Sequence, residues 1–186
     1  MTWPANTIPA STLSLDASAL INLLATTECE RILEALDRRC IVEEHVLEEI
    51  TRHPIPEYCH LTVIETLSMQ GLISIERMSD ASYDLYLNLV SGDSTTALDD
   101  GESATIAIGI ERAASPILDD GKARKLFAKQ FVGHSYYSSL HLLLSAARNA
   151  KWPKERVVNC ASLARRHARI AVVRGEEEWA RWLGIR

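Results

Sequence analysis

Apolar residues follow two alternating patterns along this chain: short continuous runs, and longer segments in which they recur every three or four positions. The short runs predict strands, and the longer spacing predicts helices. Strands are predicted at 12–15, 40–42, 72–75 and 116–118. Helices are predicted at 18–26, 28–38, 46–51, 61–69, 81–90, 102–113 and 122–129, with Ser18 as the first N-cap. Strands that alternate with helices indicate a parallel sheet covered on both faces.

The last part of the chain has a different pattern, because strands give way to amphipathic helices, predicted at 138–150, 157–167 and 176–183. Basic residues also gather in this part: Arg165, Arg166, Arg169, Arg174, Arg181 and Arg186. Neither a linker rich in Gly or Ser nor an internal repeat separates it from the rest. We therefore expect an α/β domain at 1–132 and a helical extension at 133–186 that packs on it.

Composition limits the classes of protein to which the chain can belong. A formal charge of −5 argues against a protein that binds nucleic acid over its whole surface, but it allows an acidic site beside a basic patch. The four cysteines form no CxxC pair, so reduced thiols in a cytoplasmic protein are expected. No secretory signal is predicted. No membrane-spanning segment is predicted either, since the longest apolar run, 140–147, contains His141 and Ser145.

Carboxylates stand at four places where a predicted strand ends or a helix faces inward. They are Asp16, Glu49, Glu102 and the pair Asp119-Asp120. The carboxyl ends of parallel strands border one crevice, so side chains that are distant in sequence are expected to meet there. Clustered carboxylates raise one another's pKa values unless a cation neutralises them, and Mg²⁺ or Mn²⁺ prefers such oxygen ligands. The pattern favours a metal-dependent phosphoryl-transfer site.

Each carboxylate taken alone has an ordinary structural role. Asp16 or Asp100 would cap a helix, and Asp119-Asp120-Gly121 is a common turn composition. Glu48-Glu49 is typical of a solvated helix face. Their joint occurrence at elements that border one crevice favours a common site.

Four segments, in this order, resemble the motifs of the PIN domain, the small α/β nuclease fold of the toxins in VapBC-type toxin–antitoxin pairs. They are Leu15-Asp16-Ala17-Ser18, Val46-Leu47-Glu48-Glu49-Ile50, Asp100-Gly101-Glu102-Ser103-Ala104 and Ile117-Leu118-Asp119-Asp120-Gly121-Lys122-Ala123-Arg124. The last two resemble a subgroup with a Gly-Glu third acid and an Asp-Asp fourth acid. The likeness covers roughly 12–130 and implies a PIN-like three-layer α/β/α fold with a central parallel sheet, followed by the helical extension.

The resemblance implies a metal-dependent endoribonuclease, with Asp16, Glu49, Glu102, Asp119 and Asp120 as catalytic residues. Direct or water-mediated ligands of Mg²⁺ or Mn²⁺ would be Asp16, Glu102, Asp119 and Asp120. Ser18, Lys122 and Arg124 would contact the RNA substrate or its phosphates. The choices between Glu48 and Glu49, Asp99 and Asp100, and Asp119 and Asp120 stay open.

A toxin of this kind is expected to form a homodimer or to receive an antitoxin segment through its apolar tail helices. A second hypothesis is a non-catalytic interaction module, in which a PIN-like fold without productive metal binding serves as a scaffold or binds nucleic acid. Binding of Mn²⁺ distinguishes the two.

Overall fold

The computed structural model describes residues 3–93 and 97–185. Residues 94–96, between the helices predicted at 81–90 and 102–113, lie outside the described residues, and so does Arg186. Within these ranges, no helix combines the length and the apolar character that crossing a membrane requires.

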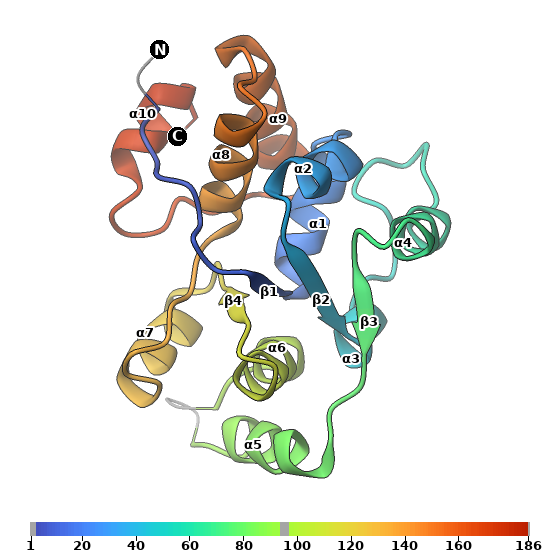
Figure 1. Cartoon of the computed structure of the whole chain (residues 1–186), viewed down its shortest axis with the longest axis vertical. Coiled ribbons are helices and arrows are strands. Elements are labelled where there is room, and N and C mark those ends of the chain that lie inside the picture. Colours follow the sequence, from blue (N-terminus) through green and yellow to red (C-terminus); the bar gives the residue numbers. More distant parts are fainter. Residues whose placement is uncertain (1–2, 94–96, 186) are drawn as a thin grey trace.

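The centre of the fold is a sheet in which all strand pairs are parallel. Its strands are β1 (Thr12–Leu15), β2 (Arg39–Glu43), β3 (Ser74–Glu76) and β4 (Ser115–Ile117), in the spatial order β3-β2-β1-β4 (Figure 1). Leu13 of β1 pairs with Cys40 on one side and with Ser115 on the other. Since β1 is central and every strand runs the same way, Asp16 and Asp119 follow their strands at the same edge of the sheet.

Helices cover both faces of this sheet. Their bounds are α1 (Ala17–Ala25), α2 (Cys29–Leu36), α3 (Glu44–Glu48), α4 (His60–Met69), α5 (Asp80–Val90), α6 (Asp100–Glu111), α7 (Gly121–Gln130), α8 (Ser139–Asn149), α9 (Lys154–His167) and α10 (Glu177–Leu183). Figure 1 shows α1, α2, α8 and α9 on one side of the sheet and α5 and α6 on the other. The predicted three-layer α/β/α architecture is confirmed.

The largest core cluster joins the sheet to the helices of the first face. Helix α1 is buried along most of its length, between the sheet and helices α8 and α9. Residues of α8 and α9, such as Leu144 and Val157, belong to the same cluster as Leu13 of β1. The helical extension thus shares a core with the strands. A second cluster under α5, α6 and α7 surrounds Phe127.

Two hydrogen bonds fix helix α6 to strand β1. The hydroxyl of Ser14 donates to the Thr105 carbonyl at 3.1 Å, and the hydroxyl of Thr105 donates to the Leu15 carbonyl at 3.4 Å. Gly109 allows this close approach, because a Cβ there would lie 2.7 Å from the Ser14 hydroxyl oxygen and 3.3 Å from the Ala114 carbonyl oxygen. These contacts fix the start of α6 relative to the end of β1.

The chain that leads into α8 runs along the outer side of β4. The amide of Leu118 donates to the Tyr137 carbonyl at 2.8 Å, and the amide of Tyr137 donates to the Pro116 carbonyl at 3.0 Å. Tyr137 also forms an isolated parallel bridge with Ile117. This pairing brings Ser139, the first residue of α8, beside Asp119.

Candidate active site

Asp16 is the N-cap of helix α1. Its Oδ1 accepts the amide of Ala19 at 2.6 Å, and the hydroxyl of Ser18 donates to both carboxylate oxygens at 3.0 and 2.9 Å. The prediction that Ser18 is the N-cap is therefore wrong, because the side chain that satisfies the first turn comes from Asp16. Asp16 is only 3% exposed, and burial raises its pKa well above the usual value, with further increases from the charges of Asp119 and Glu102.

Asp119 and Asp120 are adjacent in sequence but have different roles. Asp119 is partly buried, and its Oδ2 accepts the Asn22 side-chain amide at 2.9 Å while its Oδ1 accepts the Ser139 amide at 2.8 Å. Burial raises the pKa of Asp119 in spite of these hydrogen bonds. Asp120 is the N-cap of α7, and its Oδ1 accepts the amides of Lys122 and Ala123 at 2.6 and 2.9 Å.

Glu102 is in the first turn of α6, whose N-cap is Asp99. Its pKa is raised to about 8, first by burial and then by the charges of Asp99, Asp120 and Glu49. Lys122 opposes this increase. Glu102 therefore lies in the electric field of residues from α3, α6 and α7, and it also acts on Asp16 at the end of β1.

Glu49 follows the last residue of α3 and lies against the first turn of α6. Its carboxylate accepts the backbone amide of Gly101. An ideal Cβ at Gly101 would lie 2.5 Å from Glu49 Oε1 and 2.8 Å from its Cδ, so only glycine leaves room for this carboxylate. Burial and the charges of Asp99 and Asp100 raise the pKa of Glu49. Glu48 and Glu49 are both exposed, and Glu49 is the one whose carboxylate lies against Gly101.

The candidate substrate contacts are partly engaged within the protein. Arg124 donates from Nη1 to the Leu118 carbonyl at 3.0 Å, and its guanidinium carbon lies 4.8 Å from the centre of the Tyr136 ring. The ammonium of Lys122 donates to the Ala97 carbonyl. Ser18, as described above, donates to Asp16. Of these three side chains, Lys122 is the one whose charge acts on Glu102.

The family to which the chain belongs follows from a comparison with known proteins. The model of the PIN-domain family DUF3368 matches residues 13–171. This chain belongs to the PIN-domain family. PIN domains are in general nucleases that act on nucleic acid with divalent metal ions. No curated protein and no solved structure matches the chain.

Asn22 and Ser139 are residues of this PIN domain that the sequence reasoning missed. Asn22 lies on the buried side of α1, and its side-chain amide also donates to the Ser139 hydroxyl at 3.3 Å. Its Oδ1 has no hydrogen-bond partner among the described residues. A single amide within the apolar run Leu20–Leu24 was the available signal, because a buried polar group requires a partner.

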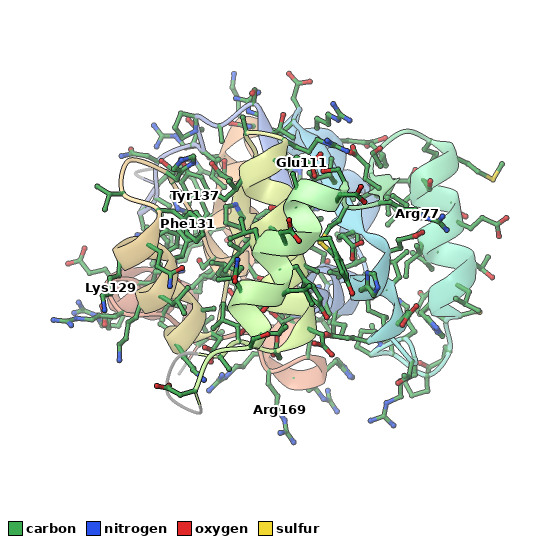
Figure 2. The ribbon with its side chains drawn as sticks, turned by 90° about the horizontal axis from the view of Figure 1, so that it is seen from below. Arg77, Glu111, Lys129, Phe131, Tyr137 and Arg169 are labelled. Carbon is green, nitrogen blue, oxygen red and sulfur yellow. The ribbon has the colours of Figure 1, made fainter. Side chains whose placement is uncertain are left out.

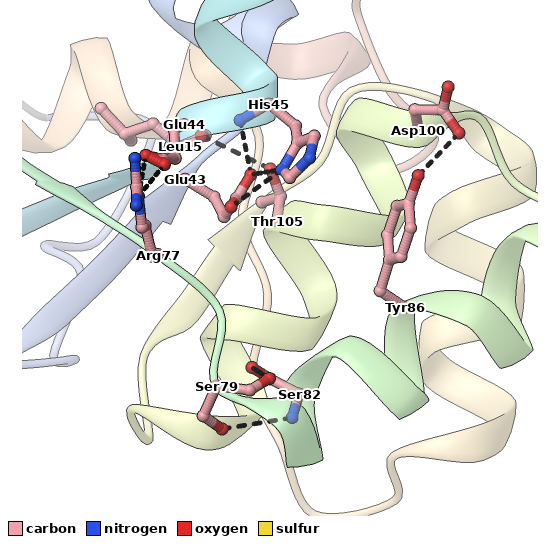
Figure 3. Close-up of polar contacts among 10 residues, drawn as sticks. All are labelled: Leu15, Glu43, Glu44, His45, Arg77, Ser79, Ser82, Tyr86, Asp100 and Thr105. Carbon is pink, nitrogen blue, oxygen red and sulfur yellow. Dashed lines mark hydrogen bonds and ion pairs between the residues drawn. The ribbon is translucent and has the colours of Figure 1, made fainter.

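A second polar cluster lies beside the acids, in the close-up of Figure 3. Glu43 ends β2 and is 1% exposed, and it accepts the His45 amide at 2.7 Å and contacts His45 Nδ1 at 3.0 Å. The hydrogen bond to Glu43 raises the pKa of His45. Tyr86 donates its hydroxyl to Asp100 Oδ1 at 3.0 Å. Glu43 is therefore paired with His45, and Asp100 with Tyr86.

The donor set of this PIN domain fits a hard divalent cation by its chemistry. Burial and mutual repulsion raise the pKa values of Asp16 and Glu102, and a cation between such groups would remove this repulsion. Gly101 leaves room for one more carboxylate, that of Glu49. In the part of the chain that the structure describes, no group of three His, Cys, Asp or Glu side chains already has the arrangement of a metal site. The carboxylates would therefore have to turn toward the ion on binding.

Replacing Gly101 by Ala is expected to weaken Mn²⁺ binding at least tenfold, about 1.4 kcal/mol, while the protein stays folded. The new methyl group displaces the Glu49 carboxylate, which is the free end of a flexible side chain. The helix itself gains up to about 1 kcal/mol from Ala in place of Gly. Calorimetric titration with Mn²⁺ and thermal unfolding measure the two effects. Unchanged affinity would show that the position of Glu49 is irrelevant to metal binding.

Gly109→Ala is the matched control, because it places the same methyl group in the same helix. Here the obstacle is the Ala114 carbonyl and Ser14 of the central strand, so α6 itself must move. We expect this variant to lose stability, whereas Gly101→Ala keeps it.

Proposed function

We propose that this PIN domain is an endoribonuclease that uses Mg²⁺ or Mn²⁺ to hydrolyse RNA phosphodiester bonds. The observation that carries the proposal is the mutual electrostatic coupling of acids from separate elements. Asp119 raises the pKa of Asp16, and Glu102 acts on Asp16 as well. Asp120 and Glu49 raise the pKa of Glu102. Residues that only capped their own helices would not require this proximity.

Asp16, Glu102 and Asp119 are the residues proposed to hold the cation. A divalent cation bound by carboxylates lowers the pKa of a bound water molecule and neutralises charge on the phosphate. Asn22 and Ser139 hold Asp119 from one side, and Ser18 and the Ala19 amide hold Asp16. These hydrogen bonds hold the two carboxylates at the same edge of the sheet, from where they would have to turn toward the ion on binding.

Glu102 and Glu49 are proposed to position water near the phosphate. The pKa of Glu102 is about 8, so without a cation its carboxyl group holds a proton at neutral pH. With a cation held beside it, Glu102 would favour its charged form and would lose that proton. Glu49, held by the Gly101 amide, would accept the proton of the attacking water.

The different environments of Asp119 and Asp120 provide a direct test. Asp119→Asn is expected to reduce the cleavage rate of RNA at least about a hundredfold, because it removes a partly buried negative charge that acts on Asp16. Asp120→Asn is expected to change the rate less than about tenfold, since Asn is an equally good N-cap for α7. Cleavage of labelled RNA with Mn²⁺ and with EDTA measures both. Equal loss in the two variants would refute the assignment of Asp119 as the ligand.

Calorimetric titration separates the nuclease from the scaffold hypothesis. A nuclease of this kind binds Mn²⁺ with measurable heat that Asp16→Asn abolishes. A protein that shows no heat and no RNA cleavage is the non-catalytic module instead.

We also propose that the nuclease is the toxin of a toxin–antitoxin pair that acts on RNA in the cytoplasm and forms a homodimer. The support is the likeness of its acid motifs to the toxins of VapBC-type pairs. Production of the wild-type protein in a bacterial host is then expected to stop growth, and Asp119→Asn to abolish that effect. Growth arrest by both proteins would contradict a toxin role based on cleavage.

A further inference from the structure

Helix α7 carries an unusual concentration of lysine. Three of the five lysines in the chain, Lys122, Lys125 and Lys129, lie in this helix, and the other two are Lys151 and Lys154. The helix contains Arg124 as well and no acidic residue. In a chain of formal charge −5, this helix is a local positive surface.

Helix stability explains only part of this concentration, because Lys129 alone lies in the last turn, where the helix dipole favours a cation. The positive end of a helix dipole is at its N-terminus, so a cation in the first turn is unfavourable. Lys122 nevertheless lies there, and the first turn has no acidic residue. Lys125 and Lys129 are exposed and form no salt bridge with any residue in the described ranges.

The lysines border a hollow that begins at Asp120, the N-cap of α7. This hollow has a volume of about 490 Å³, and Asp120 lines it together with Lys122, Lys125 and Lys129. The start of the row adjoins the proposed active site, because Lys122 lies in the first turn of α7, directly after Asp119 and the N-cap Asp120. From Lys122 to Lys129 the helix rises by about 10 Å. Figure 2 shows Lys129 at the outer side of the molecule, away from Arg169.

We propose that Lys125 and Lys129 bind the phosphodiester backbone of the nucleic-acid strand on the side of the cleavage site that α7 borders. The lysines form a row that leads away from Asp120, so a strand with its scissile phosphate at the acids continues along α7. The ammonium groups neutralise successive phosphates without reading bases. This inference rests on the proposed nuclease function and adds to it the path that the bound strand follows beyond the cleavage site.

The test compares two charge-matched double variants in the Asp119→Asn background, in which bound RNA stays intact. Lys125→Gln with Lys129→Gln removes the proposed contacts. Arg166→Gln with Arg174→Gln removes the same charge from exposed positions near the end of the chain. Binding of a short labelled single-stranded RNA is measured by fluorescence anisotropy over a range of salt concentrations, for several base sequences.

The lysine variant is expected to bind about tenfold more weakly for every base sequence. The slope of log K against log salt is expected to fall by about 1.4, since each contact with a single strand contributes about 0.7. The arginine variant is expected to retain both values. Equal effects in the two variants would overturn the inference while the nuclease assignment stands. Absence of RNA binding and of cleavage by the wild-type protein would overturn both.

Discussion

Asp16→Asn is expected to lower kcat/KM for metal-dependent RNA cleavage at least about a thousandfold, while the protein remains folded. Asp16 is buried at the carboxyl edge of the central strand, and its pKa is raised by burial and by the charge of Asp119. The substitution removes one of the negative charges that would hold the cation. Asn keeps the N-cap of α1, and it also removes a charge that burial disfavours, so stability in the absence of metal is not expected to fall.

The control for this variant is Asp37→Asn. Asp37 is an exposed carboxylate that precedes β2, at the opposite edge of the sheet from Asp16. Its backbone is left-handed, with φ of 51°, which Asn tolerates. Cleavage by this variant is expected to equal that of the wild-type protein. If Asp16→Asn also cleaves RNA at the wild-type rate with circular dichroism unchanged, Asp16 is not part of the active site.

Mn²⁺ is expected to raise the melting temperature of the wild-type protein by about 5–10 °C at pH 8, and by much less at pH 5. An ion at one hundred times its dissociation constant stabilises the folded state by about 2.7 kcal/mol, and each kcal/mol raises Tm by about 2–4 °C in a chain of this size. Below its pKa each carboxyl group holds a proton that competes with the ion. Thermal unfolding with Mn²⁺ and with EDTA at both pH values measures the difference.

The sign of the pH dependence without metal follows from the raised pKa of Glu102, about 8 against a usual value of 4.5. Between these pH values the folded state binds more protons than the unfolded state. The contribution of Glu102 to stability is therefore present at acid pH and is lost as pH rises toward 8. The raised pKa values of Asp16 and Asp119 act in the same direction. Glu102→Gln is expected to reduce this loss. A wild-type protein in EDTA whose stability is the same at pH 5 and pH 8, and which Mn²⁺ does not stabilise, would contradict the carboxylate cluster.

The sequence could not show which member of each acidic pair belongs to the candidate site. Asp119 and Asp120 are chemically identical neighbours, and each is compatible with a cap or with a ligand. The difference arises because Tyr137 pairs with Ile117 beyond the edge of the sheet and brings Ser139 beside Asp119. That pairing joins segments that no local pattern connects. The position of Glu49 against Gly101 likewise depends on the packing of α3 against α6.

The sequence by itself determined the alternation of strands and helices, the bounds of the first strand at 12–15 and the family to which the chain belongs. These properties depend on local periodicity and on short motifs, which survive in a one-dimensional pattern. Only the tertiary structure decided that Asn22 and the Ser139 amide hold Asp119, and that the Glu49 carboxylate lies against Gly101. Each of these depends on distances between residues far apart in the chain, and such distances are determined by the packing of the helices on the sheet.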